Sequence, residues 1–156
     1  MKLHLIAVGH KMPGWVDAGF DDYARRMPPD LPLRFTAIKP GHRTAGEDGA
    51  RARQVEAERI LAALPEGSVA VVLDERGTQV TTRELAQWMQ GWMGEGVSPA
   101  FVIGGADGLD DRVKARAGRL MGLSRLTLPH ALARVVLAEQ LYRAACILKG
   151  HPYHRD

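Results

Sequence analysis

Short apolar runs alternate with longer amphipathic stretches along the whole chain. The clearest run covers residues 69–73, which are continuous, rich in β-branched side chains and few, as is typical of a strand buried on both faces. Residues 33–38 instead alternate between apolar and polar positions, and this period of two also indicates a strand. Strands are predicted at residues 3–8, 33–38, 69–73, 99–103 and 123–128.

The longer segments between these runs predict helices, and residues with known terminal preferences mark where they begin. Pro13 and Pro129 suit a first helical position. Thr81 and Glu84 have the spacing of a capping box, and Asp110 is a suitable N-terminal cap. Helices are predicted at residues 13–26, 48–64, 81–93, 110–119 and 129–149.

The alternation of strand and helix continues without an internal repeat or a linker, which predicts a single domain over residues 1–156. This pattern is typical of an α/β fold with a mostly parallel sheet flanked by helices. Ligands of such sheets bind at the carboxyl ends of the strands. We therefore expect a binding site at the loops after Leu73, after Ile103 and around Leu128.

Composition narrows the class of protein without naming a function. The 156 residues are 46% hydrophobic and 25% charged, which is ordinary for a globular domain and excludes a disordered tail, a collagen-like fibre or a membrane span. Cys146 is the only cysteine, so no disulfide forms within the chain and a reducing compartment is favoured. The first nine residues lack the features of a signal peptide. We expect a cytoplasmic protein.

The charge distribution favours a polyanionic partner only modestly. The formal net charge is +3 and the sequence pI is about 9.3, with basic residues concentrated in the N-terminal third and at the C-terminal end. These residues predict a modest basic surface and exclude a polybasic membrane segment.

A glycine-rich loop at residues 104–108 directly follows a predicted strand. Glycines there allow a ligand to approach the backbone, although a tight strand-to-helix turn would explain the loop equally well. The loop is neither a dinucleotide-binding fingerprint nor a P-loop, which disfavours a nicotinamide enzyme and an ordinary NTPase. The polar residues 74–76 after the strongest strand are a second candidate, and their alternative is a solvated loop.

The C-terminal tail combines groups that suit RNA better than a metal. His151 and His154 form one histidine pair, whereas a structural zinc site needs four ligands, so a metal site is not expected. Tyr153 and Arg155 are residue types that stack on bases and pair with phosphate. From these residues alone, the chain is a small-ligand-binding α/β domain with a basic terminus, and no reaction follows.

Several longer motifs, however, occur together and in a fixed order. They are the segments 8–13, 73–77, 101–109, 126–130, 138–144 and 151–155. Their combination resembles the SPOUT methyltransferases, and within them the group that methylates N3 of a pseudouridine, pseudouridine-1915, in bacterial 23S rRNA. The resemblance covers nearly the whole chain and is most specific in the two C-terminal motifs.

The resemblance implies a fold, a cofactor and partners. It implies a parallel-sheet α/β domain with a C-terminal trefoil knot, S-adenosyl-L-methionine as methyl donor, a homodimer, and 23S rRNA within the assembled ribosome as substrate, with no metal and no membrane. Carried over by position, the cofactor-binding residues are Leu73, Gly104, Gly105, Leu123, Ser124, Arg125, Leu126, Thr127 and Leu128.

The resemblance also suggests roles for basic and tail residues. His154 is the candidate general base for N3 and Tyr153 a positioning or stacking group, because the nitrogen must lose its proton during methyl transfer. Arg134, Arg143 and Arg155 are the expected RNA-binding residues. Many members of the family have glutamate at the position of Asp107. Residues 40–53 resemble the family only loosely, so no role is transferred to residues 40–53.

Two other functions remain open on the sequence. One is a SPOUT methyltransferase that acts on another RNA, such as tRNA. The other is a noncatalytic module that binds S-adenosylmethionine and associates with the ribosome. The small size and the specific tail disfavour the first, and the joint presence of the glycine loop and the tail disfavours the second.

Overall fold

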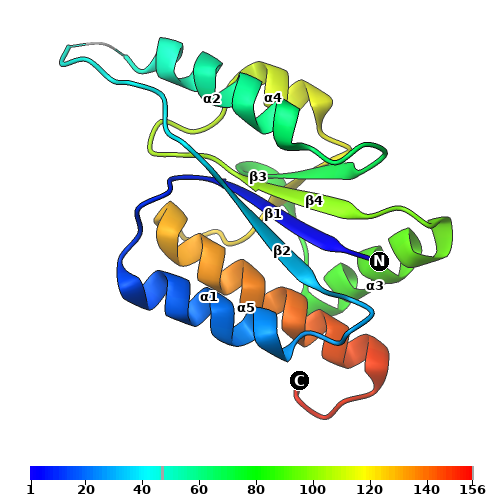
Figure 1. Ribbon diagram of the computed structural model, residues 1–156. Helices are drawn as coiled ribbons and strands as arrows, with labels where there is room; N and C mark the ends of the chain where they lie inside the picture. The colour runs from blue at the N-terminus through cyan, green and yellow to red at the C-terminus, as the bar shows by residue number, and fades with distance from the viewer. Residues whose placement is uncertain (47, 156) are drawn as a thin grey trace.

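The chain folds around one parallel sheet with helices on both faces (Figure 1). A computed structural model describes residues 1–46 and 48–155, and within them the sheet has five strands in the order β2-β1-β4-β3-β5. All neighbouring strands pair in parallel. The strands are β1 (Leu3–Val8), β2 (Leu33–Ile38), β3 (Val69–Gln79), β4 (Pro99–Ile103) and β5 (Arg119–Gly122).

Two hydrophobic cores lie on opposite faces of this sheet. One lies beneath three helices and contains Leu3, Leu5 and Phe101, and the other lies beneath two helices and contains Ile6 and Val102. Alternate residues of one strand enter different cores because side chains project to opposite faces. The first set of helices is α1 (Gly14–Arg26), α3 (Thr82–Glu95) and α5 (His130–Lys149), and the second is α2 (Ala50–Ala63) and α4 (Asp111–Arg116).

Most predicted boundaries are confirmed to within two residues. Helix α3 begins with the predicted capping box, in which the Glu84 backbone N–H donates to the Thr81 hydroxyl at 3.1 Å and the Glu84 carboxylate accepts from Thr81 N–H at 2.6 Å. Asp110 caps α4 as predicted, but this helix ends at Arg116 and not at residue 119. The chain leaves the helix early because residues 119–122 pair with β3.

The prediction of a loop at residues 74–80 is wrong for most of that segment. Strand β3 continues to Gln79, and its pairing with β5 is interrupted between Leu73 and Thr78. The residues between these two points form an irregularity like a β-bulge. Bulges are common next to active sites, where they redirect side chains. The bulge carries Asp74, Glu75 and Arg76 toward the pocket described below.

The predicted strand at residues 123–128 is also wrong. The fifth strand is Arg119–Gly122, and residues 123–128 form the loop that leads to α5. The apolar residues of this loop do not form a buried strand, and Leu126 is 76% exposed. Pairing of Met121 with Leu73 outweighs the weak strand preference of Arg119 and Gly122, because strand formation depends on tertiary neighbours.

Two further expectations about the fold concern a membrane-spanning helix and the trefoil knot. No helix among residues 1–46 and 48–155 is long and apolar enough to cross a membrane. The trefoil knot remains a prediction, because strand order and pairing define neighbours and not the threading of the chain.

Gly77 allows β3 to lie against β5, and its replacement is expected to destabilise the fold. A Cβ atom at this position would lie 2.5 Å from the Met121 carbonyl carbon and 2.7 Å from the Gly122 nitrogen. Since backbone atoms cannot move aside cheaply, Gly77→Ala is expected to lower the free energy of unfolding by about 2 kcal/mol. Urea denaturation measures this loss.

Gly91→Ala is the matched control, because a Cβ at Gly91 meets nothing within 4 Å on helix α3. This variant is expected to gain roughly 0.5 kcal/mol from improved helix propensity. Equal stability of the two variants would contradict the close approach of β3 to β5.

Candidate active site

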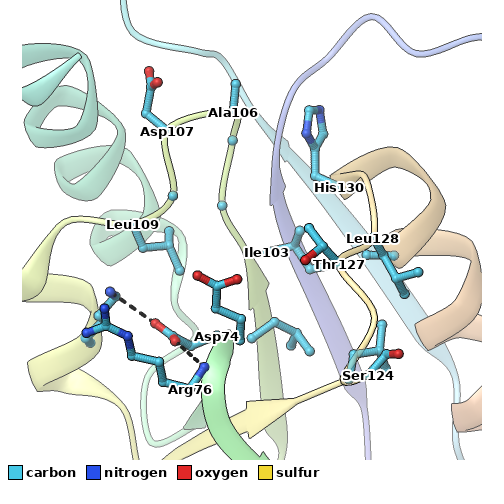
Figure 2. A pocket seen from close by; sticks show the side chains of 18 of the residues that line it. Asp74, Arg76, Ile103, Ala106, Asp107, Leu109, Ser124, Thr127, Leu128 and His130 are labelled. Atoms are coloured by element: carbon cyan, nitrogen blue, oxygen red, sulfur yellow. Dashed lines mark hydrogen bonds and ion pairs between the residues drawn. The ribbon is translucent and has the colours of Figure 1, made fainter. Parts of the chain in front are cut away.

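A pocket of about 480 Å³ opens at the carboxyl end of β4 and beside the bulge of β3 (Figure 2). Three chain segments build it: the start of the β3 bulge, the glycine loop after β4, and the loop between β5 and α5. Helix α5 lines one side with His130 and Ala133. The three expected segments meet at one site, although residues 73–76 belong to strand β3 and do not form a loop after it.

The pocket contains eight of the nine residues that the sequence assigned to cofactor binding. Arg125 is the exception and does not line the pocket. The eight are Leu73, Gly104, Gly105, Leu123, Ser124, Leu126, Thr127 and Leu128. The sequence therefore predicted which segments meet, although it assigned the wrong secondary structure to one of them.

Charged residues on one wall of the pocket were not among the sequence-assigned site residues. Asp74 accepts a hydrogen bond from the Arg76 backbone N–H at 2.8 Å and forms an ion pair of 3.0 Å with Lys114 (Figure 2). The backbone hydrogen bond, followed by Lys114, holds the pKa of Asp74 below its usual value. The signal available in the sequence was the position of residues 74–76 directly after the strongest strand.

The two walls of the pocket differ in polarity. Figure 2 shows Asp74 and Arg76 on one side and Ser124, Thr127 and Leu128 on the other. The second wall carries no charged side chain among these three residues and offers hydroxyl and backbone groups. The pocket can therefore hold a small molecule with both a charged end and a neutral hydrogen-bonding part.

The glycine loop folds tightly beside this pocket. Gly108 N–H donates to the Gly105 carbonyl at 3.1 Å, and Gly108 adopts a φ of 78°, a left-handed conformation that favours glycine. A Cβ atom at Gly104 would lie 2.7 Å from Cγ of Leu109, another residue that lines the pocket. A side chain at position 104 would therefore displace Leu109 or the glycine loop, and both line the pocket.

The candidate catalytic residues of the tail lie in a cluster on helix α5. The Tyr153 hydroxyl donates to Glu139 at 3.0 Å, and the Arg143 guanidinium donates to the same carboxylate oxygen at 2.6 and 2.9 Å. Arg143 also lies 4.6 Å from the centre of the Tyr153 ring and 3.5 Å from Nδ1 of His154. Glu139 thus connects the residues to which the sequence assigned chemistry.

Neither Tyr153 nor His154 lines the pocket. His130 begins helix α5 and lines the pocket, whereas the tail follows the helix after Lys149 (Figure 1). The tail then folds back along the helix, so that the Tyr153 hydroxyl contacts Glu139. Glu139 lies six residues after Ala133, the last residue that lines the pocket, which is about 9 Å at 1.5 Å per residue.

The three expected RNA-binding arginines differ in their surroundings. Arg134 is only 2% exposed, lies 4.8 Å from the Phe35 ring and donates to the Gly9 carbonyl at 3.3 Å. Burial lowers its pKa, and this placement does not fit a contact with phosphate. Arg143 is partly exposed and Arg155 is exposed, so both can reach a partner from the tail end of the molecule.

Tyr153 is expected to make the stability of the protein fall at high pH. Burial, followed by the hydrogen bond to Glu139, raises the pKa of Tyr153 to about 12 from the ordinary 10.0. Between these values the folded protein keeps a proton that the unfolded chain has lost, so this contribution is present below pH 10 and disappears as the pH rises toward 12. Urea denaturation between pH 9 and 12 should show a steeper loss for the wild type than for Tyr153→Phe. Equal slopes would contradict the shift.

Comparison with known proteins assigns the chain to one family. The family model described as "Predicted SPOUT methyltransferase" matches residues 1–154. The chain is 78% identical over 156 residues to "Ribosomal RNA large subunit methyltransferase H" of Thiobacillus denitrificans, covering 100% of both chains. A protein of the same name from Burkholderia multivorans is 55% identical over 155 residues, which are 99% of each chain.

A solved structure supports the fold at much lower sequence identity. The crystal structure of a probable methyltransferase from Bordetella pertussis Tohama I has a TM-score of 0.59 and 17% identity, and the match covers 92% of this chain and 93% of that one. The family match over residues 1–154 and the full-length similarity to these relatives establish that the chain belongs to the SPOUT methyltransferases.

Proposed function

We propose that this SPOUT methyltransferase uses S-adenosyl-L-methionine to methylate N3 of a pseudouridine in the 23S rRNA of the assembled ribosome. The observation that carries the proposal is the pocket formed by the three segments that the family resemblance assigns to the cofactor. The relative at 78% identity, by its name, acts on large-subunit ribosomal RNA, which supports the substrate class. The cytoplasm, where ribosomes work, is the proposed location.

The residues around the pocket fit S-adenosylmethionine. The volume of about 480 Å³ lies in the range of small-molecule sites. Gly104 lets Leu109 pack closely against the glycine loop, and residues 123–128 can offer backbone groups to an adenine. When bound, this cofactor supplies an electrophilic methyl group and a positive charge next to the reacting nitrogen.

The tail supplies the groups that would act on the substrate base. N3 of pseudouridine carries a proton that must leave, and His154 is the proposed acceptor because histidine is the side chain that most often acts as a general base. Tyr153 is the proposed positioning group, since its ring can stack on a base while its hydroxyl remains held by Glu139 at 3.0 Å. Glu139 and Arg143 keep the tail in place on α5.

We propose a homodimer in which the tail of each chain acts at the pocket of its partner. Within one chain neither Tyr153 nor His154 lines the pocket, and the Tyr153 hydroxyl is held by Glu139. A second copy that places its tail over the first copy's pocket would complete both sites by symmetry. We propose this arrangement, with RNA recognised across the two subunits.

RNA binding is proposed to rest on shape and phosphate contacts. Arg143 and Arg155 lie at the tail end of the molecule and carry the charge for it, whereas the buried Arg134 does not. Such contacts release counterions, so the affinity for the ribosome should fall steeply as salt rises.

The test is transfer of radiolabelled methyl groups from S-adenosylmethionine to three substrates. These are assembled 70S ribosomes, free 23S rRNA, and ribosomes that lack the target pseudouridine, with the labelled nucleoside identified by mass. Label on N3 of pseudouridine in the first substrate alone supports the proposal. Label on another nucleoside would indicate a methyltransferase for a different RNA site, and cofactor binding without any label would indicate a noncatalytic module.

A further inference from the structure

A polar connection joins the glycine loop of the pocket to helix α2 on the same side of the sheet. It runs from Glu56 on α2, through Arg43, to Asp107 in the glycine loop. Arg43 belongs to the segment 39–46 that follows β2, which is far from the glycine loop in sequence. Neither the sequence motifs nor the resemblance assigned a role to Arg43 or Glu56.

Glu56 is the fixed end of this connection. The residue is 2% exposed, and its carboxylate accepts from the Gly41 N–H at 2.9 Å and from the Arg43 guanidinium at 3.1 Å. A buried carboxylate needs such donors, since an unpaired charge in the interior is strongly unfavourable. Gly41 also packs so closely on α2 that a Cβ atom would lie 2.6 Å from the Ala52 carbonyl oxygen. The segment is therefore held firmly against the helix.

Asp107 is the end of the connection that lies at the pocket. It lines the pocket as part of the glycine loop, and its carboxylate forms an ion pair with Nε of Arg43. Figure 2 shows this carboxylate pointing away from Asp74. Gly49 approaches from the other side, where a Cβ atom would lie 2.5 Å from Oδ2 of Asp107. The Asp107 side chain thus has one position, set by the segment after β2 and the start of α2.

Arg43 is suited to this task because its guanidinium contacts two carboxylates and a backbone carbonyl at once. It donates to Glu56, to Asp107 and to the Gly41 carbonyl at 3.1 Å. The hydrogen bonds to Asp107 and then to Glu56 raise the pKa of Arg43 above its usual value. A lysine, with one ammonium group, could not reproduce this planar set of donors.

We propose that Arg43 is a positioning residue for the cofactor: by joining Asp107 to the buried Glu56, it holds the glycine loop in the conformation that binds S-adenosylmethionine. The inference rests on the proposed function, because it assumes that this cofactor occupies the pocket. Arg43 itself does not line the pocket, so it acts through Asp107 and the loop backbone.

The experiment measures the dissociation constant of S-adenosylmethionine by calorimetry, together with kcat and the KM for the cofactor on 70S ribosomes. Arg43→Met is expected to bind the cofactor about tenfold more weakly, a loss typical of second-layer partners of a ligand site. Its KM should rise while kcat at saturating cofactor stays within about twofold, because no reacting group has changed. If Arg43→Met does not fold, Arg43→Lys replaces it in the experiment, because the lysine keeps a positive charge beside Glu56.

The matched control is Arg59→Met. Arg59 also lies on the α2 side and donates to the Lys39 carbonyl at 2.7 Å, so it contacts the same segment but does not reach the glycine loop. Its loss is expected to leave cofactor affinity unchanged. An equal effect of Arg43→Met and Arg59→Met would reduce the role of Arg43 to general stabilisation and overturn the proposal.

A double-mutant cycle tests whether Arg43 acts through Asp107. Asp107→Asn should weaken cofactor binding by about the same factor as Arg43→Met, and so should the double variant that carries both changes. Asp107→Glu should keep most of the wild-type affinity. Independent, multiplying losses would show that Asp107 acts on the ligand by itself and would contradict the proposal. If wild-type protein fails to bind S-adenosylmethionine, the proposed function itself is wrong, whereas wild-type binding with an unaffected Arg43→Met contradicts this inference alone.

Discussion

Truncation of the chain after Gly150 is expected to lower methyl transfer by about 100-fold or more while leaving cofactor binding intact. The truncation removes Tyr153 and His154, and loss of a general base typically costs this much in rate. The pocket keeps all its lining residues, since none of them lies beyond Ala133. Single-turnover methylation of 70S ribosomes measures the first effect and calorimetry with S-adenosylmethionine the second.

The variant His154→Ala tests the proposed general base alone, because it leaves the rest of the tail in place. It retains Tyr153, whose hydroxyl donates to Glu139, and so preserves the hydrogen bond that holds the tail on α5. A rate equal to that of the wild type would eliminate His154 as the base and leave positioning as the tail's function.

Mixed dimers test which pocket the tail serves. The truncated chain has a pocket but no tail, and a chain with Gly104→Val has a tail but a blocked pocket. If tails act across the dimer, random mixing makes half of the dimers mixed, each with one complete site, and restores about a quarter of the wild-type rate. If each tail served its own pocket, the mixture would stay inactive, and the proposed arrangement would be wrong.

Gly104→Val is expected to weaken cofactor binding by about 100-fold. Already the first added atom, Cβ, would lie 2.7 Å from Cγ and 3.0 Å from Cδ2 of Leu109. Either Leu109 or the glycine loop must then move, and both line the pocket. Displacement of a binding loop by about 1 Å is enough for losses of this size.

Calorimetry with S-adenosylmethionine measures the effect, with Gly91→Val as the control. The control adds the same side chain to a helix position where nothing lies within 4 Å, so affinity should be unchanged. Normal affinity of Gly104→Val would mean that the cofactor does not bind beside the glycine loop, and would remove the main support for the proposed function.

The sequence by itself determined most of the architecture. Residues 3–8 and 99–103 were predicted as strands because strands covered on both faces are apolar at nearly every position, and burial of Leu5, Ile6 and Phe101 confirms this. Helix starts were equally readable, because capping by Thr81 or Asp110 involves residues only two or three positions apart. Sequence patterns therefore predicted those elements whose stabilising interactions join residues close together in the chain.

The last strand was not predictable in this way. Arg119 and Gly122 are poor strand residues, and they pair with β3 because the chain returns to that edge of the sheet. A strand was predicted at residues 123–128 instead because of Leu123, Leu126 and Leu128, although these residues line the pocket and Leu126 is exposed. Which apolar segment is buried depends on neighbours that lie far away in sequence.

For the site, the sequence determined the segments and the tertiary structure decided the relations among side chains. The loops after Leu73 and Ile103 were expected at one site because strand ends of a parallel sheet meet at one edge, and the family resemblance then assigned Leu73 and Gly104 to the cofactor. Only the structure shows that Arg134 is buried, that Tyr153 folds back onto Glu139, and that Arg43 joins Glu56 to Asp107. Such contacts join residues that are far apart in the chain: Arg134 and Gly9, for example, are 125 positions apart. A local pattern of hydrophobic and polar residues cannot predict contacts of this kind.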